Sequence, residues 1–129
     1  METILVVDDE PSLRNMLIRS ISAGGYTVLE AASGREAVQL VRSFAEPIHL
    51  AIIDHTLEDR NGADVAAEIA RIRPGVRVLL ISGKLEHDVL PSSVPCTTAL
   101  SFLQKPFMTR ALLDRIRTIL SDRSNRAGM

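Results

Sequence analysis

Short apolar runs alternate with amphipathic stretches along almost the whole chain. Five of the runs have the length and continuity of strands that are buried on both faces of a sheet. They are Thr3–Val7, Tyr26–Ala31, Leu50–Ile53, Val76–Ile81 and Ser101–Gln104. The pattern therefore predicts five strands, each separated from the next by enough chain for a helix.

Between these strands, apolar residues recur at the spacing of amphipathic helices. Helices are expected from Pro11 to Gly24, from Ser33 to the residues before Pro47, and from Gly62 to Pro74. A last helix is expected to start at a Thr109 cap and to turn Leu112, Leu113, Ile116 and Leu120 inward. Prolines at 91 and 95 leave room for only a shortened fourth helix near Leu85–Leu90.

This alternation predicts an α/β fold, in which a doubly wound, five-stranded parallel sheet carries helices on both faces. The chain of 129 residues has the size of one domain, expected to span residues 1–122, with a frayed tail at Arg123–Met129. In such sheets the ligand site lies beyond the carboxyl ends of the strands. Those ends are therefore where chemistry is expected.

Composition excludes several functions. Fifteen basic and sixteen acidic residues give a formal net charge of −1, which argues against a nucleic-acid partner. The single cysteine, Cys96, excludes an intramolecular disulfide. No apolar run is long enough to cross a membrane and no signal-peptide pattern opens the chain, so a cytoplasmic location is expected.

The near-neutral total conceals two asymmetries. Residues 1–62 contain ten acids and five bases, or −5, whereas residues 63–129 contain six acids and ten bases, or +4. Thirteen of the fifteen basic residues are arginine, and the two lysines are Lys84 and Lys105. A lysine at the end of the last strand is therefore unusual for this chain.

Charged and hydroxyl side chains follow four of the predicted strands. The first strand is followed by Asp8, Asp9 and Glu10, the third by Asp54, the fourth by Ser82 and the fifth by Lys105. Carboxylates that converge from neighbouring strands repel one another, which favours a bound cation, and oxygen ligands suit Mg²⁺. Asp54 can then serve as a nucleophile in phosphoryl transfer, while Lys105 and Ser82 contact the phosphoryl oxygens.

Simpler interpretations account for single residues of this set. Asp9 or Glu10 can cap the first helix, and Asp54 can be a surface loop residue. The histidines, which lack the spacing of metal ligands, are His49, His55 and His87. His55 follows Asp54 and is expected to point away from the pocket. No phosphate-binding glycine motif occurs, so a nucleotide site is not expected.

Four segments at successive strand ends resemble the receiver domains of two-component response regulators. They are ILVVDDE at 4–10, LAIID at 50–54 with Gly62 eight residues further on, LLISG at 79–83 and FLQKPF at 102–107. The resemblance covers residues 3–121. It implies a flavodoxin-like sheet with the strand order 2-1-3-4-5. It also implies a signalling module that phosphorylates and dephosphorylates itself, and not a turnover enzyme acting on an external substrate.

The resemblance also implies a role for each site residue. Asp54 would be the phosphoacceptor. Asp8, Asp9, Asp54 and the backbone carbonyl of Thr56 would bind Mg²⁺, or alternatively Mn²⁺. Ser82 and Lys105 would contact the phosphoryl group, and Ser82 and Phe102 would form the switch. Thr56 and Lys84 would tune the lifetime of the phosphate, and the peptide between Lys105 and Pro106 would be cis.

The implied phosphoryl donor is a histidine kinase or a histidine phosphotransfer protein. The output would pass to a downstream protein target, and the domain would be a monomer or a weak dimer. A receiver excised from a hybrid histidine kinase is an alternative context. A receiver-like binding module that is never phosphorylated is an alternative function.

The chain departs from the family pattern in three places. Leu57 and Glu58 stand where the family often has Met-Pro, so the charged loop that follows Asp54 is expected to be more mobile. Phe102 carries no hydroxyl, so switching would proceed through packing. The shortened fourth helix would remodel the surface that the family commonly uses for partners or dimers.

Overall fold

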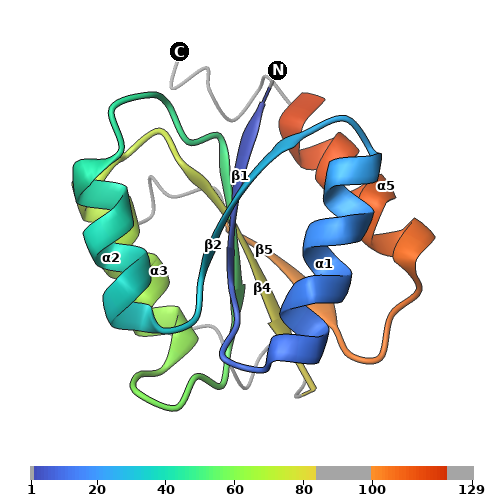
Figure 1. Cartoon of the computed structure of the whole chain (residues 1–129), viewed down its shortest axis with the longest axis horizontal. Coiled ribbons are helices and arrows are strands. Elements are labelled where there is room, and N and C mark those ends of the chain that lie inside the picture. The colour runs from blue at the N-terminus through green and yellow to red at the C-terminus, as the bar shows by residue number, and fades with distance from the viewer. Residues whose placement is uncertain (1, 84–99, 122–129) are drawn as a thin grey trace.

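The computed structural model describes residues 2–83 and 100–121, in which strands and helices alternate as predicted (Figure 1). The strands are β1 (Thr3–Val7), β2 (Thr27–Ala31), β3 (Leu50–Asp54), β4 (Arg77–Ser82) and β5 (Leu100–Gln104). The helices are α1 (Pro11–Ala23), α2 (Gly34–Ser43), α3 (Gly62–Ile72) and α5 (Thr109–Ser121). The predicted short helix near residues 85–90, Lys84 and the tail 123–129 lie outside the described residues.

The strands form one parallel sheet in the order β2-β1-β3-β4-β5, which confirms the predicted fold and strand order. In the register, Val7 of β1 lies opposite both Ala31 and Ile53. Asp54 at the end of β3 lies opposite Ile81 of β4. The carboxyl ends of β1, β3 and β4 therefore finish at the same edge of the sheet.

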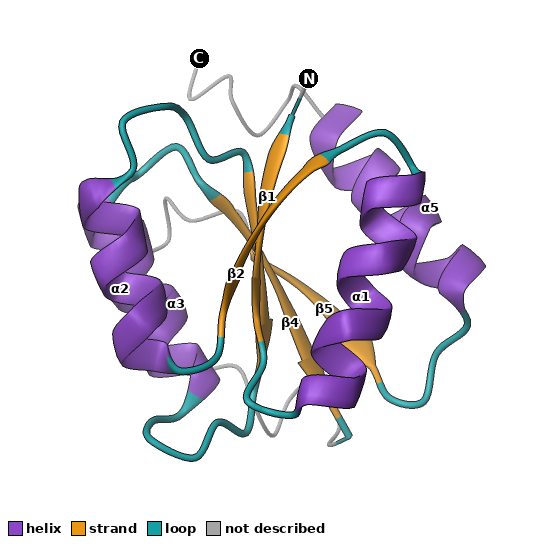
Figure 2. Cartoon of the chain, in the orientation of Figure 1, coloured by secondary structure: helices purple, strands orange, loops and turns teal. Residues whose placement is uncertain are grey.

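Helices cover both faces of this sheet, with α2 and α3 on one side and α1 and α5 on the other (Figure 2). Successive side chains of a strand point to opposite faces, so β1 contributes to two cores. Leu5 and Val7 belong to the core under α2 and α3, whereas Ile4 and Val6 belong to the core under α1 and α5. Burial on both faces explains why β1, β3 and β4, which are buried along their whole length, are built mostly from apolar residues.

Several limits of the strands differ from the prediction. β2 begins at Thr27, one residue late, and β5 begins at Leu100, one residue early. β3 extends through Asp54, and β4 runs one residue later than predicted, from Arg77 to Ser82. Arg77 can enter a strand that is otherwise apolar because its side chain is buried and donates to the carbonyl of Ile119 in α5.

The start and inner face of α5 also differ from the prediction. Thr109 is the first helical residue, and the first helical hydrogen bond is accepted by the carbonyl of Met108, so the predicted Thr109 cap is wrong. The fully buried residues of the helix are Leu112, Ile116 and Ile119, while Leu113 and Leu120 are half-buried. None of the helices in the described part of the chain is long and apolar enough to span a membrane.

Candidate functional site

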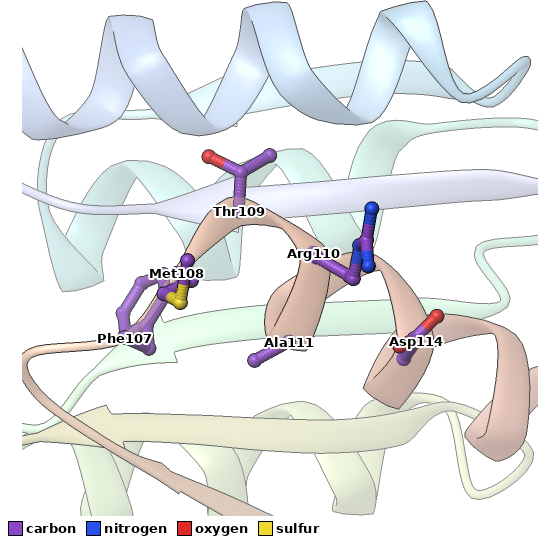
Figure 3. Close-up of a pocket in the computed structure, with 6 residues that line it drawn as sticks. All are labelled: Phe107, Met108, Thr109, Arg110, Ala111 and Asp114. Carbon is purple, nitrogen blue, oxygen red and sulfur yellow. The ribbon is translucent and has the colours of Figure 1, made fainter.

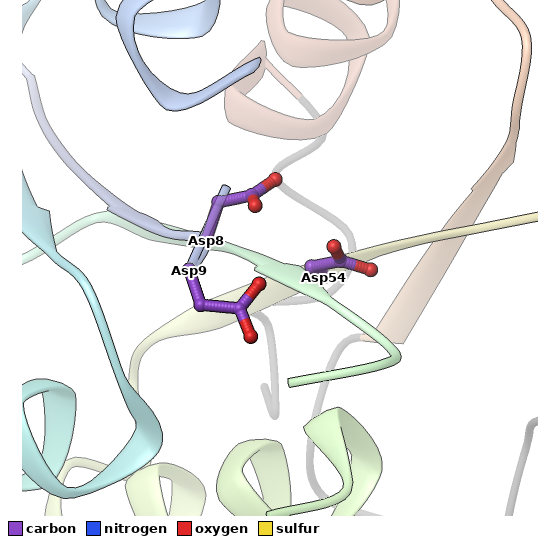
Figure 4. Close-up of side chains that lie close together, drawn as sticks. All are labelled: Asp8, Asp9 and Asp54. Atoms are coloured by element: carbon purple, nitrogen blue, oxygen red, sulfur yellow. The ribbon is translucent and has the colours of Figure 1, made fainter. Parts of the chain in front are cut away.

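Three carboxylates gather at the carboxyl edge of the sheet (Figure 4). Because Val7 and Ile53 are register partners, Asp8 and Asp54 follow from neighbouring strands, and Asp9 continues the chain beyond β1. One carboxylate oxygen from each of Asp8, Asp9 and Asp54 lies within 4.8 Å of the other two. The sequence predicted this convergence, and the pairing of β1 with β3 accounts for it.

Each of these carboxylates accepts a hydrogen bond from a main-chain N–H group. Asp8 Oδ1 accepts from the Glu10 N–H at 2.9 Å, and Asp54 Oδ1 accepts from the Thr56 N–H at 3.1 Å. Asp9 Oδ2 accepts from the Glu58 N–H at 2.7 Å. These bonds fix the orientation of all three side chains.

Asp8 is a buried carboxyl group whose pKa is raised. It is 1% exposed, and burial raises the pKa of its carboxyl to about 6. The hydrogen bond from Glu10 opposes the rise, and the negative charge of Asp54 adds to it. A buried carboxyl beside two others fits a site that a cation would stabilise, and a donor set made only of oxygen suits a hard ion such as Mg²⁺.

Lys105 brings the positive charge of the site to Asp54. Its Nζ lies 3.3 Å from Asp54 Oδ2. The Lys105 N–H donates to the carbonyl of Ser82 at 2.7 Å, which joins the ends of β4 and β5. Ser82 is buried at that edge. The Lys105–Pro106 peptide is cis, the configuration that the resemblance implies.

The three acidic residues after β1 have two different structural roles. Glu10 is the cap of α1, where its side chain accepts from the N–H groups of Ser12 and Leu13 at 3.1 and 2.9 Å. The capping interpretation is therefore right for Glu10, while Asp8 and Asp9 belong to the cluster. Sequence reasoning missed Arg14, whose Nη1 donates to the carbonyl of Asp8 at 2.8 Å. Its helical spacing gave no sign of this contact.

The loop that follows Asp54 is held to the rest of the structure at several positions. Leu57 is buried, Thr56 forms a β-bridge with Asn61, and the Gly62 N–H donates to the carbonyl of His55 at 2.7 Å. Asp59 accepts from two N–H groups at the start of α2. These contacts join the loop to the rest of the structure at several positions, and the expectation that it is more mobile stays a prediction.

Gly62 explains the glycine of the resemblance in steric terms. A Cβ atom at this position would lie 2.2 Å from the carbonyl oxygen of Asp54 and 2.8 Å from His55 Cα. Only glycine lets the first turn of α3 approach the backbone of Asp54 so closely.

The remaining predicted residues are less directly connected to the cluster. Phe102 is half-buried and packs against the core under α2 and α3. Lys84 lies outside the described residues. His49 accepts from the Thr3 N–H through Nδ1, a structural role, and His55 is buried at the end of β3. Within the described ranges, the metal-type cluster contains no histidine.

A surface pocket opens beyond this edge, at the start of α5 (Figure 3). Its lining residues are Phe107, Met108, Thr109, Arg110, Ala111 and Asp114. Met108 is 77% exposed, which is high for a large apolar side chain. Flexible, polarisable methionines are common at protein-binding surfaces.

Comparison with known proteins agrees with this geometry. The family model of the response regulator receiver domain matches residues 4–117. The response regulator receiver protein CpdR of Brucella abortus (strain 2308) is 27% identical over 120 residues, which make up 93% of this chain and 98% of CpdR. A crystal structure of the receiver domain from the hybrid histidine kinase CckA has a TM-score of 0.78 and 30% identity, covering 92% of this chain and 99% of that one.

Other relatives are much longer than this chain. The sensor kinase CckA of Brucella abortus (strain 2308) is 29% identical over 118 residues, which are 92% of this chain but only 12% of the kinase. The chain likewise spans 25% of a transcriptional regulatory protein of Escherichia coli (strain K12), GlrR. What this chain shares with these proteins is one domain. By its fold, the acidic cluster at the carboxyl edge of its sheet and the family match, the chain belongs to the response regulator receiver domains of two-component signalling.

Proposed function

We propose that this receiver domain accepts a phosphoryl group from a phosphohistidine onto Asp54. The observation that carries the proposal is the convergence of Asp8, Asp9 and Asp54 within 4.8 Å, with Lys105 Nζ 3.3 Å from Asp54. A carboxylate oxygen of Asp54 would attack phosphorus, and the bond from phosphorus to the histidine nitrogen would break. The imidazole would leave with that electron pair and take a proton from solvent, and Asp54 would become an acyl phosphate.

The chain's own residues have distinct parts in this step. Asp8, Asp9, Asp54 and the carbonyl of Thr56 would hold Mg²⁺, or Mn²⁺ in its place, because all of them offer oxygen ligands. A bound divalent cation supplies positive charge against the transferring phosphoryl oxygens. Lys105 would exchange its carboxylate partner for one of those oxygens, and the Ser82 hydroxyl would donate to another.

The phosphorylated state would differ from the free state mainly in charge. An aspartyl phosphate carries close to two negative charges where the Asp54 carboxylate carried one, and its phosphoryl oxygens reach further toward Ser82 and Lys105. As these two residues move toward it, the ends of β4 and β5 would move together, since Lys105 is bonded to the Ser82 carbonyl. Phe102, half-buried and without a hydroxyl, would respond by repacking. Thr56 and Lys84 would set the rate at which the phosphate is hydrolysed.

The expected partners follow from this chemistry. The donor would be a histidine kinase or a histidine phosphotransfer protein in the cytoplasm, and the output a protein target bound by a monomer or weak dimer. The pocket at Phe107 and Met108 is a suitable contact surface, since it contains the exposed Met108 and follows Lys105 closely in the chain. The same step suits a separate protein or the receiver of a hybrid kinase, and relatives of both kinds occur.

Acetyl phosphate tests the proposal without knowledge of the partner. Incubation with acetyl phosphate and Mg²⁺ should add one phosphate, located on Asp54 by mass spectrometry of borohydride-reduced peptides. Asp54→Asn should take none, and a chelator should abolish uptake by the wild type. Phosphate on another residue, or no phosphate at all, would contradict the proposal. A partner that binds wild type and Asp54→Asn equally, with or without phosphodonor, would support a constitutive binding module instead.

A further inference from the structure

Two consecutive residues of the loop between β3 and α3 connect the acidic cluster to α2. The Glu58 N–H donates to Asp9 Oδ2 at 2.7 Å. Next to it, Asp59 Oδ1 and Oδ2 accept from the N–H groups of Gly34 and Arg35, each at 3.0 Å. The loop therefore contacts a candidate metal ligand at one residue and the first turn of a helix at the next.

The two contacts depend on each other through the backbone. A two-point hydrogen bond between Asp59 and the start of α2 fixes where the chain passes, and with it the direction of the adjacent N–H group. Further along the loop, Arg60 Nη1 contacts Glu68 Oε1 of α3 at 2.7 Å. With the loop held from both helices, the Glu58 N–H stays directed at Asp9.

This arrangement is specific to the residues of this chain. Where the family often has proline, this chain has Glu58, and proline has no N–H to donate. The exposed carboxylate of Asp59 has an unusual target for a loop residue, because it binds two main-chain groups 24 and 25 positions earlier in the sequence. Neither contact involves residues beside Asp54 itself.

We propose that Asp59 is a positioning residue for the metal-binding carboxylate of Asp9, acting through the Glu58 N–H. Asp59 holds the loop against α2, the Glu58 N–H holds one oxygen of Asp9, and the other oxygen is left for the cation. This inference rests on the proposed function, in which Asp9 binds Mg²⁺. It adds that the contacts of Asp59 and the Glu58 N–H orient the Asp9 carboxylate before the cation binds.

The competing explanation is that Asp59 merely caps α2, and the chain offers a matched control for it. Ser33 caps the same helix from within its own segment, because its side chain accepts from the Glu36 N–H at 3.1 Å. Asp59→Ala and Ser33→Ala should therefore lower the melting temperature of the metal-free protein by similar amounts. Only Asp59→Ala should weaken Mg²⁺ binding.

The first experiment is a calorimetric titration of Mg²⁺ into these two variants, with Mn²⁺ titration by electron paramagnetic resonance as a second readout. Loss of an outer-shell partner typically costs a metal site about 10-fold or more in affinity, so Asp59→Ala should raise the Kd of Mg²⁺ about 10-fold. Ser33→Ala should stay within about twofold of the wild type. Asp59→Asn, which retains one acceptor oxygen, should lie between them. Equal affinities for Asp59→Ala and the wild type would overturn the inference.

A second experiment isolates the N–H group. Glu58→Ala and Glu58→Pro both remove the side chain, but only proline removes the donor to Asp9. Glu58→Ala should bind Mg²⁺ like the wild type, and Glu58→Pro should bind about 10-fold more weakly. Equal binding by these two variants would show that the donor has no effect on the site and would overturn the inference.

Hydrogen exchange of the Glu58 amide in metal-free protein separates this inference from the proposed function. Exchange should be slow in the wild type and in Ser33→Ala, and at least 10-fold faster in Asp59→Ala. Unchanged exchange in Asp59→Ala would overturn the positioning role, whatever the protein binds. A wild type that shows slow exchange but takes no phosphate on Asp54 would overturn the proposed function and leave the positioning role supported.

Discussion

Asp8, Asp9 and Asp54 are oriented by main-chain donors at very different distances along the chain. Asp8 and Asp54 each accept from the N–H two residues later, so the turn after each strand supplies the donor locally. Asp9 accepts from an N–H 49 residues later. Two of the carboxylates are therefore ordered by their own turns, and the third depends on the tertiary fold. The orientation of Asp9 should accordingly be the most sensitive of the three to distant substitutions.

A side chain at position 62 would have a steep steric cost beside Asp54. In Gly62→Ala the new methyl group would meet the Asp54 carbonyl oxygen at 2.2 Å, and neither backbone can give way without moving the site. We expect a loss of about 3 kcal/mol in the free energy of unfolding. At Gly34 the nearest atom is a side-chain carbon of Val65 at 2.7 Å, which can turn aside, so Gly34→Ala should cost about 1 kcal/mol.

Urea unfolding of the alanine variants measures this ranking, with Gly75→Ala as control. A Cβ at Gly75 would meet no atom within 4 Å, so its effect should be within about 0.5 kcal/mol. If Gly62→Ala were as stable as Gly75→Ala, the close approach of α3 to Asp54 would be contradicted.

The raised pKa of Asp8 predicts how the stability of metal-free protein depends on pH. The folded pKa is about 6 and the ordinary value is 3.8, so the carboxyl binds its proton more tightly when folded. Its contribution is fully present below about pH 4, falls as the pH rises, and is lost above about pH 6. The difference corresponds to an upper limit of roughly 3 kcal/mol.

Asp8→Asn isolates this contribution from those of other acids. In chelator, the wild type should lose stability relative to Asp8→Asn as the pH rises from 4 to 7. Urea unfolding across that range provides the measurement. A constant difference between the two proteins would contradict the assignment of the shift to Asp8.

At the scale of the elements, arginines join the ends of helices and strands. Arg73, the residue after α3, donates to the carbonyls of Val41 and Glu46 at 2.8 and 2.9 Å and also to that of Phe44. Arg77 reaches α5 at Ile119, and Arg115 of α5 reaches the carbonyl of Phe102 in β5. A guanidinium offers several donors in a planar fork, which an ammonium cannot match. These contacts give part of the arginine bias a structural reason.

Arg73→Lys tests that reason. Lysine retains the charge but cannot reach carbonyls in three directions, so the segment after α2 should lose part of its anchoring. We expect the free energy of unfolding to fall by about 1–3 kcal/mol. Arg71→Lys, at an exposed arginine in the last turn of α3, should change it by less than about 0.5 kcal/mol. Equal effects in thermal unfolding would show that charge alone matters at Arg73.

The elements could be predicted from the sequence because their signals are local. Apolar runs and helical spacing gave the order of elements, and the sheet topology then brought Asp8, Asp9 and Asp54 together. The details that the pattern did not show depend on distant contacts: Arg77 is bonded to Ile119, and the loop is bonded to α2 through Asp59. A charged residue bonded to a main-chain group far along the chain leaves no periodic pattern. Sequence alone therefore could not show how the loop is held, and its expected mobility stays a prediction.

At the scale of the whole molecule, the acidic cluster affects the stability of the fold. Residues 1–62 carry a formal charge of −5 and include all three carboxylates of the site. In the part of the chain that the structure describes, Lys105 supplies the positive charge beside them, with its Nζ 3.3 Å from Asp54 Oδ2. A metal-free protein therefore retains uncompensated negative charge at one edge of its sheet. A cation that binds only the folded state would relieve it and shift the folding equilibrium.

Mg²⁺ should therefore raise the melting temperature through this site. At a Mg²⁺ concentration 100-fold above the Kd, binding to the folded state raises the free energy of unfolding by about 2.7 kcal/mol. For a domain of this size, that raises the melting temperature by roughly 10 °C. Asp9→Asn should lose most of the rise, whereas Asp64→Asn, an exposed acid on α3 outside the cluster, should keep it. Scanning calorimetry provides the measurement. A sample in which NaCl replaces the magnesium salt at the same ionic strength controls for general charge screening. Equal rises for wild type and Asp9→Asn would mean that Mg²⁺ stabilises the fold from elsewhere, and the carboxyl edge of the sheet would no longer be the metal site.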